Sequence, residues 1–356
     1  MSKYWSKTAR NSEPYTPGEQ PKNQQYIKLN TNESPYPPSP VAVQAMIAAV
    51  GDKLRLYPDP NCDELRQSIA DYYRVGAEQV FVGNGSDEIL AFSYQAFFDP
   101  GKPILFPEIT YTFYPVYANL YGIDYRTVAQ DELFDVPLEE FCSGEAGGII
   151  LANPNSPTGN YVPLSSIERV LSSNPNCVVI IDEAYIDFGG DSAVQLINKY
   201  PNLLVMQTFS KSRCLAGLRV GFAVGQQDLI TALNRIKNSF NSYTLDRIAQ
   251  VGASEAIRDE KYFSETKTKV INTRERIKPV LEELNFQVVS SQANFIFISH
   301  PTITGEQLFR QLKERSILVR HYSLPRISNY LRVTIGTDEE MNQFLKIIAA
   351  LVAELA

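Results

Sequence analysis

Seven short apolar runs between residues 79 and 225 constrain the fold of this 356-residue chain more than any other feature. Several of them are apolar throughout instead of alternating with polar residues, which is typical of strands buried on both faces. Helical stretches separate the runs, and this alternation predicts an α/β fold in which helices sandwich a mostly parallel seven-stranded sheet. The runs read QVFVGN, PILFPE, DYRTVAQ, GGIILANP, CVVIIDEAY, LLVMQTFS and VGFAVG.

Two further regions flank this large domain, which we assign to residues 41–255. Residues 1–40 are rich in Pro, Asn, Ser and Tyr, so they predict an extended N-terminal arm instead of regular elements. Residues 256–356 predict a smaller α+β domain, which the N-terminal segment joins. Its strands are expected in QVVSSQANFIFIS, SILVRHY and YLRVTIG, and its last helix begins with a capping box formed by Thr337 and Glu340.

Charge and composition exclude several classes of function. The 33 Lys and Arg and 40 Asp and Glu residues give a net charge of −7 without a basic tract, which argues against nucleic acid and anionic membranes as partners. Two histidines exclude a His-rich metal site, and we predict no metal. The four cysteines lack metal-type spacing, no apolar run reaches about 18 residues, and no secretory signal is evident. We therefore expect a soluble cytoplasmic protein with reduced thiols.

An acid and an amine each follow a buried apolar run. Asp182 comes after CVVII, and Lys211 follows LLVMQTF, with Ser210 before it and Arg219 eight residues further on. Burying either charge alone is costly, so each side chain must find a partner, reach solvent or take part in chemistry. From these residues alone, a structural salt bridge and a reactive lysine both remain open.

A glycine-containing turn is the third notable feature. GNGSDE follows QVFV, and Ser86 is expected to cap a helix whose first turn contains Asp87 and Glu88. Free N–H groups at such a helix start can bind a phosphate, although the turn lacks the GxGxxG and GxxxxGK[ST] patterns. Ligands of open α/β sheets bind at the carboxyl ends of the strands, where these features follow their runs. Pyridoxal phosphate is one cofactor that would use a lysine, a carboxylate, a phosphate turn and an arginine together.

Longer motifs carry a resemblance to a known family. They are PYTPGEQP, KLNTNESPYPPSP, LYPDP, GNGSDE, NPNSPTG, DEAYIDF, FSKSRCLAGLRVGF and VRHYSLPRISNYLRVTIGT, in the order and spacing of that family. On these motifs the chain resembles the class II, fold-type I pyridoxal-phosphate aminotransferases over essentially its whole length. Within that family it is most similar to the branch that acts on histidinol phosphate.

The resemblance implies roles around pyridoxal 5′-phosphate. Lys211 would form the Schiff base and carry protons, Asp182 would pair with the pyridine nitrogen, and Tyr185 would hydrogen-bond the phenolic oxygen. Tyr111 would stack on the pyridine ring. The cofactor phosphate would be bound by the backbone groups of Ser86 and Asp87, by Ser210 and Arg219, and by Tyr57 of the neighbouring subunit of an obligate homodimer.

One position departs from the family pattern. The residue before PTG is usually an asparagine that contacts the phenolic oxygen, whereas here it is Ser156, preceded by Asn155. A serine can donate the same hydrogen bond but is shorter. Ser156, Asn155 or a water could therefore make this contact.

Three residues are implied for the substrates, an amino donor and a keto-acid acceptor. Arg332 would hold the α-carboxylate of the amino donor, and Arg320 the distal carboxylate of glutamate. Both arginines would meet the phosphate of histidinol phosphate. Tyr15, on the arm, would close the site from the partner chain.

The implied reaction is the transamination of L-histidinol phosphate with 2-oxoglutarate to imidazole acetol phosphate and glutamate, in histidine biosynthesis. An aromatic amino-acid aminotransferase or a threonine-phosphate decarboxylase of the same fold is the alternative, because the motifs do not fix substrate shape. Intact Lys211, Asp182 and Arg219 argue against a catalytically silent relative. The missing GxGxxG argues against a nicotinamide dehydrogenase.

Overall fold

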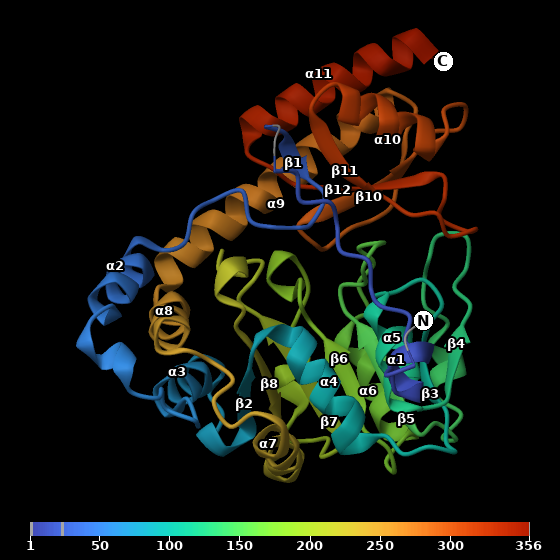
Figure 1. Cartoon of the computed structure of the whole chain (residues 1–356). Helices are drawn as coiled ribbons and strands as arrows, with labels where there is room; N and C mark the ends of the chain where they lie inside the picture. The colour runs from blue at the N-terminus through green and yellow to red at the C-terminus, as the bar shows by residue number, and fades with distance from the viewer. Residues whose placement is uncertain (1–2, 23–24, 356) are drawn as a thin grey trace.

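Two β-sheets organise the computed structural model, which describes residues 3–22 and 25–355. Figure 1 shows the larger sheet among helices in the lower part of the molecule and the smaller sheet above it. The chain therefore has the large and small halves that its sequence pattern predicts.

The larger sheet contains all seven strands expected from the apolar runs, in the order β2-β8-β7-β6-β5-β3-β4. Neighbouring strands are parallel except at β8, which pairs antiparallel with both β2 and β7. The predicted α/β fold with a mostly parallel seven-stranded sheet is confirmed. The strands are β2 (Val80–Gly83), β3 (Ile104–Pro107), β4 (Tyr125–Val128), β5 (Gly148–Ala152), β6 (Val179–Asp182), β7 (Leu203–Thr208) and β8 (Gly221–Gly225).

A hydrophobic core lies on each face of this sheet. Ile180 and Ile181, neighbours on β6, belong to different core clusters, because successive side chains of a strand point to opposite faces. Every residue of β6 and β7 is buried, which explains why these runs stay apolar until their last residues. The helices of this half are α3 (Asp63–Tyr73), α4 (Gly85–Phe97), α5 (Phe113–Tyr121), α6 (Leu164–Ser173), α7 (Gln227–Phe240) and α8 (Arg247–Arg258). Short 3₁₀ turns are η1 (Asp52–Arg55), η2 (Ala77–Gln79), η3 (Leu138–Phe141), η4 (Ile186–Phe188), η5 (Ala193–Leu196) and η6 (Ala216–Leu218).

The smaller sheet has the order β1-β11-β12-β10-β9. The stretch QVVSSQANFIFIS forms two strands instead of the single one expected, because Ser291 Oγ accepts the Ala293 N–H and donates to the Phe295 carbonyl in a turn between them. Helices accompany the sheet, as the α+β pattern predicts. The elements are β9 (Gln287–Val288), β10 (Phe295–Ser299), α10 (Gly305–Glu314), β11 (Ile317–His321), β12 (Tyr330–Thr334) and α11 (Asp338–Leu355).

The N-terminal arm is mostly extended but contains two regular elements that the sequence did not indicate. Helix α1 (Lys7–Asn11) starts where Ser6 Oγ accepts the Ala9 N–H at 3.1 Å. Strand β1 (Ile27–Leu29) pairs in parallel with β11 at the edge of the smaller sheet. The arm thus rises from α1 to the small half and returns to α2 (Pro40–Ala49) in the large one (Figure 1).

The long helix α9 (Glu260–Glu283) leads from the large half to the small one (Figure 1). Asp259 separates α8 from α9 and caps the latter by accepting the Tyr262 N–H at 3.2 Å. The same carboxylate accepts the hydroxyl of Ser39, at the start of α2, at 2.5 Å. The predicted boundary at residue 255 falls within α8, so we propose that the two halves divide at Asp259.

The predicted capping box is present at the start of α11. The Glu340 N–H donates to Thr337 Oγ1 at 3.2 Å, and the Thr337 N–H donates to Glu340 Oε2 at 2.7 Å. All four cysteines are free thiols. Within residues 3–22 and 25–355, no helix is long and apolar enough to cross a membrane, and no cluster of three acidic, histidine or cysteine side chains could hold a metal.

Candidate active site

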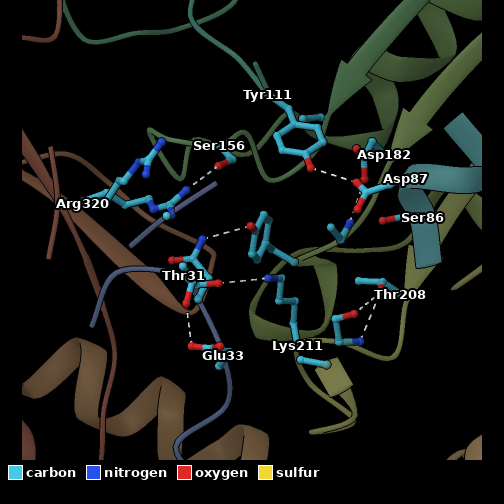
Figure 2. Close-up of a pocket in the computed structure, with 18 of the residues that line it drawn as sticks. Thr31, Glu33, Ser86, Asp87, Tyr111, Ser156, Asp182, Thr208, Lys211 and Arg320 are labelled. Atoms are coloured by element: carbon cyan, nitrogen blue, oxygen red, sulfur yellow. Dashed lines mark hydrogen bonds between the residues drawn. The ribbon is translucent and has the colours of Figure 1, made fainter. Parts of the chain in front are cut away.

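A cavity of about 290 Å³ lies between the strand ends of the larger sheet and residues of the arm and the smaller sheet. Figure 2 shows Lys211 pointing into this space, with Arg320 and Ser156 on one side and Ser86 and Asp87 on the other. Most of the residues predicted from the sequence line the cavity. They are Tyr15, Ser86, Asp87, Tyr111, Ser156, Asp182, Tyr185, Ser210, Lys211, Arg219, Arg320 and Arg332.

The amine of Lys211 forms no salt bridge within the described part of the chain. Its Nζ donates to the main-chain carbonyl of Thr31 at 3.2 Å and lies 5.8 Å from the centroid of the Tyr185 ring. Of the two possibilities left open by the sequence, the structural salt bridge is therefore not observed. The amine stands in the cavity with a carbonyl and an aromatic ring as its contacts, which suits a lysine that reacts with a ligand.

Asp182, the last residue of β6, is a buried carboxylate with neutral partners. Its Oδ2 accepts the Tyr114 hydroxyl at 3.0 Å, and its Oδ1 accepts the Ala184 N–H at 3.2 Å. Burial raises the pKa of Asp182 to about 6, although both hydrogen bonds favour the charged form. The cationic partner expected from the sequence is not supplied by the described residues, so Asp182 can receive a cationic N–H of a ligand.

The turn after β2 differs in one detail from the sequence-based prediction. Helix α4 begins at Gly85, so Ser86 is its second residue and not its cap. Glu88 Oε2 instead accepts the N–H of Asn84, the residue that precedes the helix, at 2.6 Å. Ser86 therefore lies in the first turn of the helix and lines the cavity.

Arg219 closes this end of the cavity. Its Nη2 lies 3.2 Å from Asp87 Oδ2, and its Nη1 donates to Ser210 Oγ at 3.3 Å. Gly85 has φ +80°, a left-handed backbone that favours glycine, and a Cβ there would lie 2.6 Å from Arg219 Nη2 and displace the guanidinium. The guanidinium, the serine hydroxyl and the free N–H groups of α4 together form a donor set suited to a phosphate.

Two tyrosines face the cavity between its ends. Tyr111 donates its hydroxyl to Asp87 Oδ1 at 2.9 Å, and burial raises its pKa well above the ordinary value, so it stays protonated. Tyr185 Oη accepts the Asn32 Nδ2–H at 3.0 Å, and its ring packs edge-on against Phe295. Tyr111 offers an aromatic surface and Tyr185 a phenolic oxygen to a ligand.

The structure separates the two candidates in NPNSPTG. Asn155 is buried outside the cavity lining, where its Nδ2 donates to the Ile109 carbonyl and to Thr158 Oγ1, both at 2.9 Å. Its Oδ1 accepts the Thr110 hydroxyl at 2.8 Å. Ser156 instead lines the cavity. The prediction of Asn155 as a ligand contact is therefore wrong in this structure, because its amide is used to hold the loop together.

The opposite end of the cavity carries two arginines that form no ion pair with an acidic side chain of the described residues. Arg320 on β11 and Arg332 on β12 are direct cross-strand partners, an arrangement of like charges that is unfavourable by itself. Within the described residues their hydrogen-bond partners are neutral, because Arg320 donates to the Thr16 carbonyl and Arg332 to Ser156 Oγ and the Asn30 carbonyl. Arg332 Nε is buried and has no partner there. This end of the cavity is suited to an anion.

Tyr15 reaches the cavity of its own chain, which corrects the expectation that it closes the partner's site. Its ring stacks on Phe113 with centroids 4.3 Å apart. The adjacent arm is held on the same chain by Arg320 Nη2, which donates to the Thr16 carbonyl at 3.2 Å, and by the ion pair of Glu19 with Lys313 at 2.7 Å. These contacts direct Tyr15 over the cavity from within one chain.

Tyr57 does not line the cavity of its own chain. Its side chain is 78% exposed and stacks on Tyr243 with centroids 4.5 Å apart. The Arg247 guanidinium donates to its main-chain carbonyl at 3.0 Å. The structure therefore presents Tyr57 on the surface, and its contact with a neighbouring subunit stays a prediction.

Sequence reasoning missed the arm residues that line the cavity. Thr31, Asn32 and Glu33 lie there, although KLNTNESPYPPSP was noted only as a motif. A cluster of polar residues in an arm was the available signal. Thr208 was also missed, and it donates its hydroxyl to Ser210 Oγ at 2.9 Å.

The residues present fit pyridoxal phosphate on three grounds. Within the described residues, Lys211 offers an amine without a salt bridge and Asp182 a buried carboxylate without a cationic partner, while Arg219 forms a phosphate site with Ser210 and the start of α4. These groups stand on a mostly parallel sheet at the carboxyl ends of its strands, where such folds bind ligands. Fold and site together define a fold-type I pyridoxal-phosphate enzyme.

Comparisons with known proteins agree. A family model described as aminotransferase class I and II matches residues 24–348. The histidinol-phosphate aminotransferase of Clostridium acetobutylicum is 54% identical over 353 residues, 99% of this chain and 100% of that protein. That of Clostridium beijerinckii is 56% identical over 342 residues, 96% of this chain and 95% of that protein. The chain therefore belongs to the class I and II aminotransferase family, in the branch of the histidinol-phosphate aminotransferases.

Solved structures support the same fold. The crystal structure of a histidinol-phosphate aminotransferase from Clostridium acetobutylicum matches with a TM-score of 0.85 at 24% identity, covering 92% of this chain and 99% of that one. The enzyme from Sinorhizobium meliloti, solved in complex with pyridoxal-5′-phosphate, matches with a TM-score of 0.84 at 23% identity, covering 92% and 91%. The predicted aminotransferase class and cofactor are confirmed, while the roles of individual residues stay predictions.

Proposed function

We propose that this chain transfers the amino group of L-histidinol phosphate to 2-oxoglutarate, which yields imidazole acetol phosphate and glutamate. One observation carries the proposal: the cavity has an anion site at each end, with Lys211 between them. Arg219 and the start of α4 would hold the cofactor phosphate. Arg320 and Arg332 would hold the phosphate of one substrate and the carboxylates of the other.

The charge balance of the second site favours a phosphate. Arg320 and Arg332 lie side by side, and in the described structure their hydrogen bonds go to neutral oxygens. A phosphate monoester carries nearly two negative charges at neutral pH and three acceptor oxygens, so it can satisfy both guanidinium groups at once. A neutral aromatic side chain would leave one of them without a counter-charge. The relatives at 54% and 56% identity are themselves histidinol-phosphate aminotransferases.

The residues around the cofactor would divide the work of transamination. Bound pyridoxal phosphate supplies the aldehyde that takes up the amino group and the ring that accepts electrons. The Asp182 carboxylate would accept the ring N–H and keep the ring nitrogen protonated, and Ser156 and Tyr185 would donate to the phenolic oxygen. Lys211 Nζ would bond the cofactor at rest, and it would then carry the proton from the substrate carbon that bears the amino group to the carbon of the cofactor that bears the aldehyde. Tyr15 and Tyr111, which line the cavity, would exclude water from the bound cofactor and substrate.

A homodimer would complete the site. Tyr57 follows an exposed apolar surface on α2 and η1, and such patches mark protein–protein contacts. Its loop is rigidly held, because Gln250 donates to the Asp59 carbonyl at 2.9 Å and Lys237 to the Pro60 carbonyl at 2.7 Å. We therefore infer that Tyr57 reaches the cofactor phosphate of the partner subunit. The exposed side chains are Ile47, Val50, Leu54, Leu56 and Tyr57.

We also place the enzyme in the cytoplasm. Its cysteines are unpaired, its net charge is −7, and the reaction belongs to histidine biosynthesis. Fractionation of cells that express the tagged chain would test this placement, and recovery of the activity in a secreted or membrane fraction would overturn it.

A substrate panel tests the proposed reaction. Purified protein loaded with pyridoxal phosphate is assayed with 2-oxoglutarate and, in turn, histidinol phosphate, phenylalanine, tyrosine and threonine phosphate. We expect the highest kcat/KM for histidinol phosphate. A higher value for phenylalanine or tyrosine would identify an aromatic amino-acid aminotransferase, and release of carbon dioxide from threonine phosphate would identify a decarboxylase.

A further inference from the structure

Asn32 lies in the arm with hydrogen bonds on its N–H, its carbonyl and both ends of its side-chain amide, and no role has been assigned to it above. It is 1% exposed, and its φ of +58° is left-handed, a conformation that asparagine tolerates better than most residues. Its N–H donates to Thr334 Oγ1 at 3.0 Å, and its carbonyl accepts the Asn294 Nδ2–H at 2.9 Å. Its side chain bonds to Thr334 on one side and to Tyr185 on the other.

The hydrogen-bond network fixes which end of the Asn32 amide faces Tyr185. Thr334 Oγ1 accepts the Asn32 N–H, and its single proton goes to the Asn32 side chain at 3.0 Å, because the described residues offer that proton no other acceptor. Only the carbonyl oxygen of the amide can accept that proton. The NH₂ end must therefore point at Tyr185 Oη, 3.0 Å away.

This orientation determines what Tyr185 can do. A tyrosine hydroxyl has one proton, and a lone pair of Tyr185 Oη is occupied by the Asn32 N–H. The Tyr185 proton has no acceptor within the described residues, and the hydroxyl lines the cavity. Tyr185 is thus held as a hydrogen-bond donor toward whatever occupies the cavity.

We propose that Asn32 is a positioning residue that makes Tyr185 a one-directional donor to the phenolic oxygen of the bound cofactor. The inference rests on the proposed function, since it requires that oxygen to lie beside Tyr185. It adds a dependence on the arm and the smaller sheet, because Thr334 of β12 and Asn294 hold Asn32 in place. Thr334 lies two residues after Arg332 on the same face of β12, so the substrate-anion arginine and the Tyr185 donor share one support.

The proposal predicts a spectroscopic effect. A hydroxyl that donates to the phenolic oxygen withdraws negative charge from it. That charge otherwise stabilises a proton on the nitrogen through which Lys211 holds the cofactor. Weakening the donor therefore raises the pH at which the bound chromophore loses this proton.

The test is a pH titration of visible absorbance on the cofactor-loaded protein. The primary variant is Asn32→Gly, because glycine adopts φ +58° without strain and removes only the side chain. Tyr185→Phe and the double variant Asn32→Gly/Tyr185→Phe complete a cycle. Asn30→Ala is the matched control, since Asn30 is equally buried in the arm but its Nδ2 donates to the Glu19 carbonyl and not to Tyr185.

We expect the titration midpoint to rise by roughly half a unit to one unit in Asn32→Gly, as for the loss of one hydrogen bond. Tyr185→Phe should shift it at least as far, the double variant should shift it no further than Tyr185→Phe, and Asn30→Ala should leave it unchanged. If the glycine variant does not fold, the same titration of Asn32→Asp tests the proposal instead. Its carboxylate can only accept from Tyr185, so it turns the hydroxyl away and should shift the midpoint further than glycine does.

Three outcomes would overturn the inference. An unchanged midpoint in Asn32→Gly beside a shifted Tyr185→Phe would show that Asn32 does not orient the hydroxyl. A full Asn32→Gly shift that persists in the Tyr185→Phe background would show that it acts by another route. In either case the proposed function stands. A parent protein without any covalent chromophore would overturn the proposed function, and this inference with it.

Discussion

The two ends of the cavity both present arginine, but they balance its charge differently. At the cofactor end, Arg219 Nη2 lies 3.2 Å from Asp87 Oδ2, and the two side chains are 44% and 36% exposed. At the substrate end, Arg320 and Arg332 are cross-strand neighbours with neutral partners in the described structure, and Arg332 Nε is buried without a partner. The first site is nearly neutral before its ligand binds, whereas the second carries excess positive charge.

The difference matches the ligands that the two ends would take. A resident cofactor stays bound through its link to Lys211, so its phosphate site does not need a large net charge. Substrates must bind and leave in every cycle, and an uncompensated arginine pair attracts their anions over a longer range. The strain of two like charges facing each other is relieved only when an anion binds.

Replacing Lys211, which lies between the two ends, should have the largest effect. Lys211→Ala removes both the covalent link to the cofactor and the proton carrier, so we expect kcat to fall by at least about 10³-fold. The visible absorption of the linked cofactor should disappear, as measured by a spectrum of the purified variant. Lys199→Ala is the control, since Lys199 is an exposed lysine paired with Glu168. Retention of activity by Lys211→Ala would contradict the assignment.

Breaking the substrate end should come next. Arg332→Ala should lower kcat/KM by about 100-fold for both histidinol phosphate and glutamate, because it removes a buried charge-assisted hydrogen bond from each complex. Steady-state kinetics with both substrates measure this effect, and cofactor affinity should change little. Arg310→Ala, an exposed arginine of α10 paired with Glu306, is the matched control. Unchanged kinetics for both substrates would remove Arg332 from the anion site.

The fold and the cofactor end follow from local sequence patterns. Buried strands must be apolar, so their runs and the polar residues just after them, such as Asp182 and Lys211, could be located without a structure. The glycines of GNGSDE likewise marked the phosphate turn, because they directly follow a buried strand and precede a helix. The error in this turn, Ser86 as cap, came from a competing cap, because Glu88 bonds back to the N–H of Asn84.

The contributions of the arm could not be predicted, because they depend on contacts between residues about 300 positions apart. Arg320 and Lys313 of the small half hold Thr16 and Glu19, and this directs Tyr15 into the cavity of its own chain. Asn32 is likewise placed by Thr334. No local pattern encodes such pairings. For Asn155 and Ser156, the sequence does not show which of two neighbouring side chains in a turn faces the cavity.

A buried carboxylate, Asp182, lines the cavity that joins the two ends, and it should make the cofactor-free protein sensitive to pH. Because the pKa of Asp182 is raised to about 6 from 3.8, the folded state holds its proton more tightly than the unfolded chain. That contribution to stability is complete below about pH 4 and is lost as pH rises through about 6. Relative to Asp182→Asn, the wild type should lose on the order of 3 kcal/mol of unfolding free energy between pH 4 and 7.

Urea unfolding of both proteins without cofactor, at several pH values, measures this difference. The neighbouring Glu183, whose pKa burial raises to about 8, supplies a control. Glu183→Gln should remove a pH dependence of the unfolding free energy that extends to higher pH than that of Asp182. A difference between wild type and Asp182→Asn that stays constant with pH would show that Asp182 ionises freely despite its burial.

The smallest effect should come from making the cofactor end resemble the substrate end. Asp87→Asn keeps an oxygen that can accept the Tyr111 hydroxyl but removes the negative charge beside Arg219. Because half-exposed ion pairs are worth little, we expect the affinity for inorganic phosphate in the cofactor-free protein to rise only about two- to fivefold. Titration calorimetry at low and high salt measures it, and salt should reduce the gain. Asp63→Asn, in the first turn of α3, is the matched control. If Asp87→Asn instead weakened phosphate binding, the carboxylate would serve to hold Arg219 in position, and the difference between the two ends would lie in geometry and not in charge.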